Sequence, residues 1–225
     1  NARSLVKHIN ELRILFDSSK AAVIGICESW LQSLHPNSLV DISGYKIVRH
    51  DRIRTTGVGV LFYIRSDIKY KIIHKSDPNV TNLEYLFVQL LFSAAKVIVG
   101  IVYRPDYVTE YLEHFQTVLT TLGSTCSDII VLGDFNANLL KYDKSHNLVS
   151  MIDSLALKIV PSFATCHHNN SPSTMLDVIF GNNTGKINHM HQSSLAGLSD
   201  HDFLCIDYKI KSDLPVPKKI KRRNF

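Results

Sequence analysis

The sequence lacks several features that would each point to a particular class of protein. No apolar run is long enough to span a bilayer, so we expect no membrane partner. No signal-peptide pattern is present, which predicts a protein that is not secreted. Internal repeats and low-complexity segments are also missing, which argues against a solenoid or a disordered chain. The 225 residues, 45% of them hydrophobic, suffice for one large domain with a full core.

Cysteine is scarce, and its four copies form no C-x-x-C pair. Their neighbours are apolar or mixed, which fits reduced, mostly buried thiols in a cytosolic or nuclear protein. The run Cys166-His167-His168 suggests a zinc site at first sight. Its ligand spacing fits no standard zinc pattern, so we interpret the run as part of a polar loop.

Positive charge is concentrated at the C-terminal end of the chain. Residues 209–225 hold seven basic residues and one acid, a net charge of +6, whereas the whole chain carries +5. The first 208 residues are therefore close to neutral, at about −1. The basic tail is a candidate phosphate-binding or nuclear-targeting segment, and a solvated linker is the alternative. An acidic cluster in the near-neutral body needs a cation if the protein binds a polyanion.

The stretch DIIVLGDFNAN, residues 128–138, shows the pattern around which the rest of the chain is organised. Residues 128–132 are typical of a buried strand, Gly133 ends it, and Asp134 and Asn136 follow. A strand that ends in this way holds polar chemistry on a rigid support. The alternative is an Asx turn, in which both side chains bond their own backbone.

Other apolar runs carry polar residues at or beside an expected strand end. They are Glu28 after residues 21–27, Tyr103 and Arg104 after residues 96–102, Asp177 within residues 174–180, and Asp200 and His201 before residues 203–210. Strand ends gather on one rim in layered α/β folds, so these residues can converge. Taken singly, Glu28 can instead begin a helix, and Tyr103 can lie half buried at an amphipathic edge.

The remaining pattern predicts the layout of the fold. Apolar residues on one face indicate helices at residues 5–16, 109–122 and 146–157, the first with Ser4 as N-cap. Further strands are expected at residues 60–64, 68–74 and 83–92, and residues 181–198 are expected to be mostly loop. Strands alternating with a few helices predict α/β or α+β layers with a large sheet area.

The polar residues at the strand ends predict a site for a hard cation. A carboxylate inside an apolar run, as at Asp177, is costly unless it is paired, hydrogen-bonded or bound to metal. Four carboxylates, a histidine and an asparagine, without thiolate ligands, suit Mg²⁺ or Mn²⁺.

Six stretches of the sequence resemble, in order, the motifs of the endonuclease/exonuclease/phosphatase superfamily. They are NARSL, ICESWL, VIVGIVYRP, IIVLGDFNANLL, TMLDVIF and LSDHDFLCIDY. The chain is most similar to the endonuclease domain of non-LTR (LINE-type) retrotransposons. The resemblance implies an α/β fold of the DNase I-like kind, a four-layer α/β sandwich with two facing mixed β-sheets and outer helices.

The resemblance also implies an activity, which is divalent-metal-dependent cleavage of phosphodiesters. We expect a Mg²⁺-dependent endonuclease that nicks one strand of double-stranded DNA and leaves a 3′-hydroxyl to prime reverse transcription. A reverse transcriptase domain would follow in the full-length chain, and the enzyme would act in the nucleus after synthesis in the cytoplasm. The alternatives are an abasic-site nuclease or phosphatase of the same superfamily, or a catalytically inactive DNA-binding descendant.

The resemblance assigns a role to each motif residue. Glu28 and Asn1 match the metal site, with Asp200 as a further ligand or a partner of the histidine region. Asp134 would orient or deprotonate the attacking water, with Asn136 in the same phosphate environment. Tyr103 would contact the scissile phosphate, and His201, oriented by Asp177, would stabilise its charge or transfer a proton. Contacts with nucleic acid are assigned to Arg104 and Lys144.

The chain departs from the family at its start, and the catalytic motifs do not reveal the target sequence. An apolar strand precedes the asparagine of the first motif in the family, and the sequence lacks this strand before Asn1. We therefore expect a domain at residues 1–210 without its first strand, followed by a basic linker at residues 211–225. Target specificity is assigned to the polar loops at residues 165–173 and 181–198, from their position alone.

Overall fold

The computed structural model describes residues 1–17, 19–51, 58–106, 110–168, 171–195 and 197–210. The predicted basic linker at residues 211–225 lies outside the described residues. In the described part, no helix is long and apolar enough to cross a membrane.

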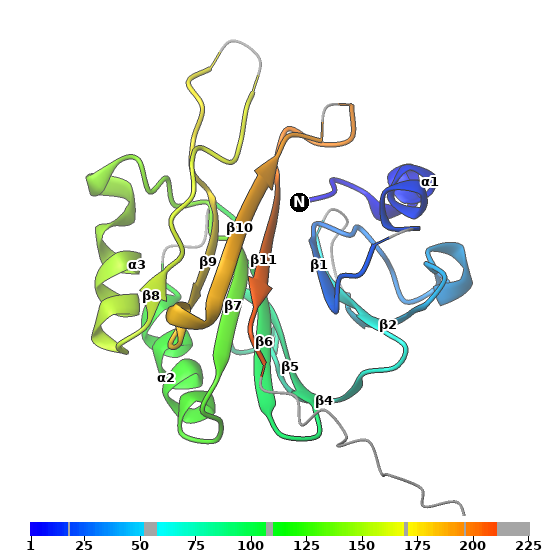
Figure 1. Cartoon of the computed structure of the whole chain (residues 1–225). Helices are drawn as coiled ribbons and strands as arrows, with labels where there is room; N and C mark the ends of the chain where they lie inside the picture. The colour runs from blue at the N-terminus through cyan, green and yellow to red at the C-terminus, as the bar shows by residue number, and fades with distance from the viewer. Residues whose placement is uncertain (18, 52–57, 107–109, 169–170, 196, 211–225) are drawn as a thin grey trace, which may run out of the picture.

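A six-stranded sheet forms the centre of the molecule (Figure 1). Only β6 and β7 run parallel, and all other neighbours in this sheet are antiparallel, so the sheet is mixed. In spatial order the strands are β4 Lys69–Lys75, β5 Glu84–Leu91, β6 Lys96–Tyr103, β7 Ile129–Asp134, β9 Asp177–Gly181 and β8 Lys158–Ile159.

A second strand layer faces the central sheet. It consists of a three-stranded sheet in the order β1-β3-β2 and a separate two-stranded hairpin, β10-β11. These strands are β1 Val23–Cys27, β2 Tyr45–His50, β3 Val60–Arg65, β10 Ile187–Ser193 and β11 Phe203–Tyr208. Both pieces are antiparallel, so the prediction of a second mixed sheet is corrected to two antiparallel pieces.

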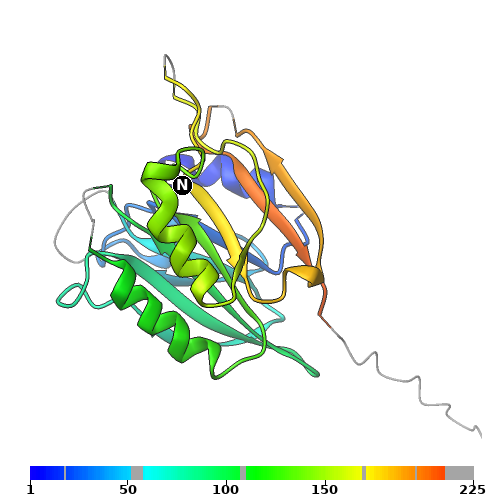
Figure 2. The same cartoon turned by 90° about the vertical axis from the view of Figure 1, so that its left-hand side faces the viewer.

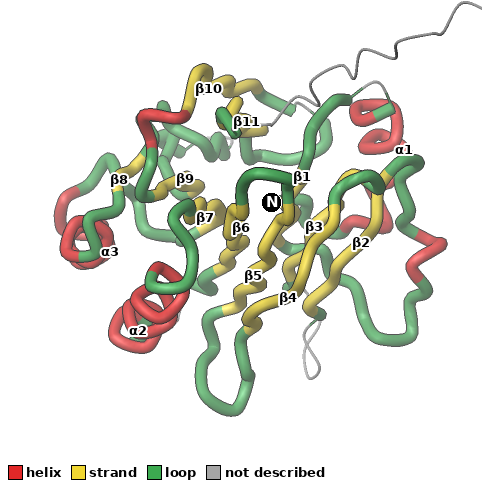
Figure 3. The backbone as a smooth tube through the Cα atoms, turned by 60° about the horizontal axis from the view of Figure 1, so that its bottom comes forward, coloured by secondary structure: helices red, strands yellow, loops and turns green. Residues whose placement is uncertain are grey.

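Helices cover both outer faces, as Figures 2 and 3 show. Helices α2 (Leu112–Gly123) and α3 (Tyr142–Ser154) cover the central sheet, and α1 (Leu5–Phe16) covers the three-stranded sheet. Two 3₁₀ turns, η1 (Asn37–Leu39) and η2 (Thr184–Lys186), complete the described elements. The layers are therefore helix, sheet, sheet and helix, and the predicted four-layer α/β sandwich is confirmed.

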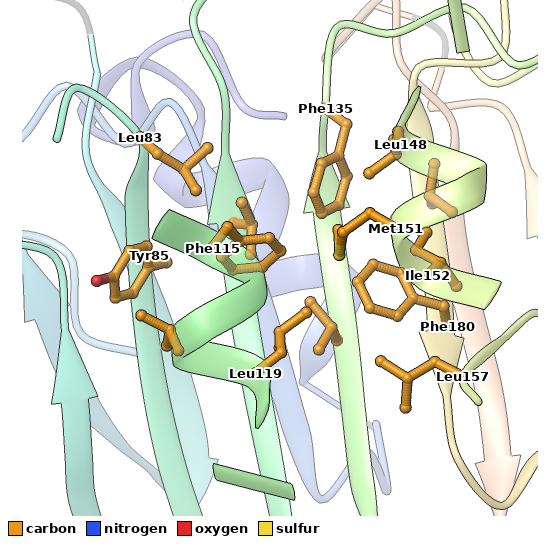
Figure 4. Close-up of a cluster of buried hydrophobic side chains, with 14 of the residues drawn as sticks. Leu83, Tyr85, Phe115, Leu119, Phe135, Leu148, Met151, Ile152, Leu157 and Phe180 are labelled. Atoms are coloured by element: carbon orange, nitrogen blue, oxygen red, sulfur yellow. The ribbon is translucent and has the colours of Figure 1, made fainter. Parts of the chain in front are cut away.

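Period-two alternation along the strands explains why the layers stack. On β5, Tyr85 and Phe87 pack beneath the outer helices, whereas Leu86 and Val88 pack against the second strand layer. Figure 4 shows the outer cluster, in which Phe115 of α2 lies among side chains of the central sheet. Since both faces of the central strands are buried, these strands appear in the sequence as continuous apolar runs.

Three segments differ from the sequence-based expectation. Residues 181–198, expected to be mostly loop, contain η2 and strand β10, which pairs with β11 along its whole length. The sequence INHMHQS hides this strand because only Ile187 and Met190 join the core. Asp177 begins β9 instead of lying inside a longer strand. Helix α3 also begins at Tyr142, four residues before the expected start.

Two strand edges flank the first residues of the chain. Among the described strands, β1 pairs only with β3, and β11 pairs only with β10. The backbone N–H of Ala2 donates to the carbonyl of Cys27 at the end of β1 (2.9 Å), and Ser199 Oγ donates to the carbonyl of Asn1 (2.8 Å). These two hydrogen bonds hold the first residues of the sequence between the two strand edges.

Gly133 allows β7 to approach β6, and its replacement tests this packing. Its φ is +151°, and a Cβ atom built there would lie 1.9 Å from the carbonyl oxygen of Val102. We expect Gly133→Ala to lower the free energy of unfolding by about 3 kcal/mol or more, because backbone atoms cannot give way. Gly123→Ala is the control, since no atom lies within 4 Å of its Cβ position. Equal unfolding midpoints in urea for the two variants would contradict this account.

Candidate active site

Predicted site residues from four separate strands meet at one rim of the layers. Glu28 follows β1 directly, Tyr103 ends β6, Asp134 ends β7 and Asp177 begins β9. The register puts Tyr103 opposite Asp134, and Asp134 opposite Asp177. The rigid central sheet therefore sets the spacing of three of these side chains, as the sequence pattern predicted.

Asn1 joins the carboxylates of two different sheets. Its Nδ2 donates to Glu28 Oε1 (2.6 Å) and to Asp134 Oδ2 (3.0 Å). The second oxygen of Asp134, Oδ1, accepts the backbone N–H of Asn136 (3.0 Å). Because each Asp134 oxygen has a donor of its own, the carboxylate has a fixed orientation.

His201 is oriented by Asp177 in a buried pair. Its Nδ1 lies 2.8 Å from Asp177 Oδ2, and both side chains are buried. Thr165 Oγ1 accepts the backbone N–H of Asp177 (3.0 Å), and Ser199 Oγ accepts that of His201 (3.1 Å). The carboxylate holds the proton on Nδ1 when the ring is neutral and leaves Nε2 for other partners.

Burial and like charge make Asp134 a weak acid. Burial, followed by the negative charge of Asp177, raises the pKa of Asp134 to about 6, while His201 and the Asn1 amide act in the opposite direction. Donor atoms of Asp134, Asp177 and His201 all lie within 4.8 Å of one another. Two buried carboxylates in such proximity, with Glu28 tied to one of them through Asn1, form a donor set that fits a divalent cation.

Tyr103 stays neutral beside these carboxylates. Burial raises the pKa of its phenol far above the usual value, and the negative charges of Glu28 and Asp134 add to the shift. A hydrogen bond with Glu28 further favours the protonated phenol. Tyr103 is therefore a hydrogen-bond donor at this rim and not a base.

Backbone strain gathers around the same residues. Five of the six non-glycine residues with positive φ in the described chain lie beside the site. The backbone N–H of Ser4 donates to the carbonyl of Glu28 (3.1 Å), so the two strained segments hold each other. Such strain persists only where surrounding contacts enforce it, and it clusters at functional sites. The five are Arg3, Ser4, Glu28, Trp30 and Asn136.

Arg104 lies under the site, where it holds the loop after β7. The Arg104 side chain is buried and donates from Nε to the carbonyl of Phe135 and from Nη2 to the carbonyl of Asn136 (2.6 Å). Asn136 Nδ2 returns a bond to the carbonyl of Arg104 (2.8 Å). These contacts give Arg104 a structural role, and its contact with nucleic acid stays a prediction.

Two other predicted residues lie apart from the carboxylate cluster. Asp200 Oδ2 pairs with Arg3 Nη1 (2.6 Å) and His168 Nδ1 (3.1 Å), and the Asp200 side chain is half exposed. This geometry pairs Asp200 with Arg3 and His168 instead of with the other carboxylates predicted to bind metal. Lys144 belongs to α3, and its side chain lies outside what the structure describes.

Sequence reasoning missed three residues that support the site. Thr165 and Ser199 fix the backbone of the Asp177–His201 pair, and Cys166 Sγ lies 3.5 Å from His201 Nε2. Ser199 was detectable because it adjoins the Asp200-His201 motif. No local pattern marks Thr165, and the Cys166-His167-His168 run gave no indication that Cys166 contacts His201, since these partners are distant in sequence.

Comparison with known proteins agrees with this geometry. The family model described as endonuclease-reverse transcriptase matches residues 97–205, from β6 into β11. A search of curated proteins finds no match.

Several solved structures share the fold over nearly the whole chain. The endonuclease domain of TRAS1, a telomere-specific non-LTR retrotransposon, matches with a TM-score of 0.72 and 18% sequence identity. The match covers 91% of this chain and 93% of the TRAS1 domain chain. A 3′ phosphatase from Neisseria bound to a product DNA hairpin has a TM-score of 0.74 and 16% identity, with coverages of 93% and 97%. The AP endonuclease LMAP from Leishmania major has a TM-score of 0.74 and 13% identity, with coverages of 92% and 85%. The resemblance read from the sequence is confirmed, and at these identities the structures establish the fold.

The raised pKa of Asp134 predicts how stability depends on pH without a divalent cation. The folded protein keeps the Asp134 proton up to about pH 6, whereas the unfolded chain loses it near pH 4. Unfolding therefore releases a proton in this window, and stability falls as the pH rises from about 4 to about 6. In EDTA at pH 7, we expect Asp134→Asn to raise the melting temperature by roughly 5 °C, with a smaller gain at pH 4.

Thermal melts of the parent and two variants at both pH values check this expectation. Asp153→Asn, an exposed acid on α3, is the control and should behave like the parent. A gain for Asp134→Asn that is equal at pH 4 and pH 7 would show that charge burial is not its cause.

Proposed function

We propose that this chain is a member of the endonuclease/exonuclease/phosphatase superfamily and a divalent-metal-dependent DNA endonuclease that nicks one strand and leaves a 3′-hydroxyl. The observation that carries this proposal is the bridge from Asn1 to Glu28 and Asp134, beside the buried Asp177–His201 pair. This arrangement brings cation ligands, a base and an oriented imidazole to one rim, as phosphodiester hydrolysis requires.

The carboxylates supply the ligands for Mg²⁺, with Mn²⁺ as a substitute. Glu28 would hold the cation together with the Asn1 carboxamide, next to Asp134. When bound, the cation supplies positive charge and Lewis acidity at the phosphate oxygens. Its charge also offsets the repulsion among the buried carboxylates.

Protein side chains carry the proton and position the phosphate. Asp134 accepts the proton of the attacking water, and its two fixed oxygens aim that water along one direction. The Tyr103 hydroxyl donates a hydrogen bond to the phosphate, as its neutral phenol allows. His201 keeps Nδ1 on Asp177 and directs Nε2 toward the charge that develops on the phosphate.

The proposal includes a role for the 3′-hydroxyl product and a cellular site for the reaction. The similarity to an endonuclease-reverse transcriptase family supports a 3′-hydroxyl that primes reverse transcription by a downstream domain, with the nucleus as the site of action. The substrate would be double-stranded DNA. We propose residues 165–168 and 171–173 as a determinant of the target, since Cys166 forms an isolated bridge with His201.

Nicking of supercoiled plasmid tests the proposed activity. We expect nicking with Mg²⁺ and none with EDTA, because the carboxylates require the cation. Asp134→Ala and His201→Ala should each lower the rate by roughly 10²–10³, since each removes one group that acts in the transition state. Asp153→Ala, on the exposed face of α3, should nick like the parent. Extension of the nicked strand by a DNA polymerase reports the 3′-hydroxyl.

The other outcomes of the assay separate the alternatives. DNA binding without nicking by a folded protein would identify a catalytically inactive descendant. Cleavage restricted to abasic DNA, or release of phosphate from a 3′-phosphorylated end, would identify the corresponding superfamily activities. Full activity of both alanine variants would reject the site itself.

A further inference from the structure

Arg3 connects the Asn1 side of the candidate site with the segment that carries His201. Its backbone N–H donates to Asn1 Oδ1 (3.2 Å), the carboxamide atom that the two site carboxylates do not use. Its guanidinium Nη1 donates to Oδ2 of Asp200, the residue before His201 (2.6 Å). The positive charge of Arg3 is therefore held beside the site from two directions.

The guanidinium of Arg3 has fewer protein partners than any other in the part of the chain that the structure describes. Four arginines donate from Nε and from both terminal nitrogens to side chains or carbonyls of the protein, and they are Arg13, Arg49, Arg65 and Arg104. Arg3 donates from Nη1 alone, because no described residue accepts a hydrogen bond from its Nε or Nη2. The planar edge formed by Nε and Nη2 is therefore open to a partner from outside the described chain.

The Arg3 side chain is accessible and at the same time restrained. It is 41% exposed, and the Asp200 side chain with which it pairs is 42% exposed. An ion pair in such contact with water contributes little to stability, because the solvent screens both charges. Its effect here is to limit the conformations of a long side chain. The open edge of the guanidinium is therefore presented in one direction, on a backbone that is itself strained, with φ at +43°.

The charge at this rim explains what an arginine in this position does. Glu28, Asp134 and Asp177 meet there, and the first 208 residues are close to neutral, so the rim itself is acidic. A polyanion that approaches these carboxylates is repelled unless positive charge lies beside them. Arg104 does not provide this charge at the surface, because its side chain is buried and donates to backbone carbonyls. Arg3 is half exposed and carries its charge on the same rim.

We propose that Arg3 binds a backbone phosphate of the DNA next to the scissile one, an inference that rests on the proposed function. The Nε and Nη2 edge presents two parallel N–H donors, which match two oxygens of one phosphate. A guanidinium binds two anions at once through different edges, in this case Asp200 at Nη1 and the phosphate at the open edge. Asp200 is then a positioning residue, which acts on the DNA through Arg3.

The salt dependence of DNA binding tests the role of Arg3 without any reference to cleavage. A fluorescent DNA duplex is titrated with protein in EDTA at several KCl concentrations. Each phosphate that the protein neutralises contributes about −0.9 to the slope of log affinity against log salt concentration. We expect Arg3→Gln to weaken binding about tenfold and to reduce the magnitude of this slope by about 1.

Three further variants separate a phosphate contact from a structural ion pair. Asp200→Asn breaks the same ion pair but keeps the guanidinium, so its slope should be at least as steep as that of the parent. Arg3→Lys keeps the charge without the planar pair of donors, and it should keep the slope but bind more weakly. Arg13→Gln is the control, because Arg13 is 38% exposed and forms a similar pair with Asp41 (2.7 Å), and it should bind like the parent.

Two results of these titrations would overturn the phosphate contact. One is a slope for Arg3→Gln that equals the slope of the parent. The other is an equal loss of slope in Arg3→Gln and Arg13→Gln, which would show that any surface charge has the same effect. Circular dichroism confirms the fold of each variant, and Arg3→Lys decides the case if Arg3→Gln unfolds, since a structural ion pair alone predicts unchanged affinity.

Steady-state nicking separates this inference from the proposed function. A contact made equally with substrate and transition state raises KM and leaves kcat nearly unchanged. We expect KM to rise about tenfold in Arg3→Gln, whose backbone N–H still orients Asn1. A lower kcat at unchanged KM would overturn the contact. A parent that binds DNA with an Arg3-dependent slope but nicks none would support the contact and reject the endonuclease.

Discussion

The repulsion between two buried carboxylates, Asp134 and Asp177, is the constraint on which the site depends. The register of β7 and β9 puts them opposite each other, and burial removes the water that would screen them. Their nearest polar partners serve to offset this charge: the Asn1 amide on one side and the His201 ring on the other. Two buried carboxylates with these partners form a donor set that suits a divalent cation.

The rest of the fold keeps these groups in place. Two apolar layers, one on each face of the central sheet, fix the strand ends from which the carboxylates project. Arg104 holds the loop after β7 from below, and the strained backbone at Glu28 and Asn136 is enforced by hydrogen bonds to neighbouring segments. The packing of the apolar layers thus compensates for the cost of the strained backbone at the rim. This relation between a core and a functional site is common in proteins.

The sequence predicted the parts of the structure that local pattern determines. Apolar runs marked the central strands, and polar residues at their ends marked Glu28, Asp134, Asp177 and His201, which the fold brings to one rim. Strand β10 was not predicted, because its half-exposed polar residues show no periodic pattern of hydrophobicity. The burial of Arg104 and the contact of Cys166 with His201 also escaped, since both depend on residues that lie far away in the chain.

The bond from Ser199 to Asn1 spans 198 positions of sequence and joins the two ends of the described domain. During synthesis Asn1 emerges well before Ser199 and His201. A partly translated chain therefore holds an asparagine and a glutamate without the aspartates and the histidine that complete the site. The candidate site is therefore complete only after nearly the whole domain has been synthesised.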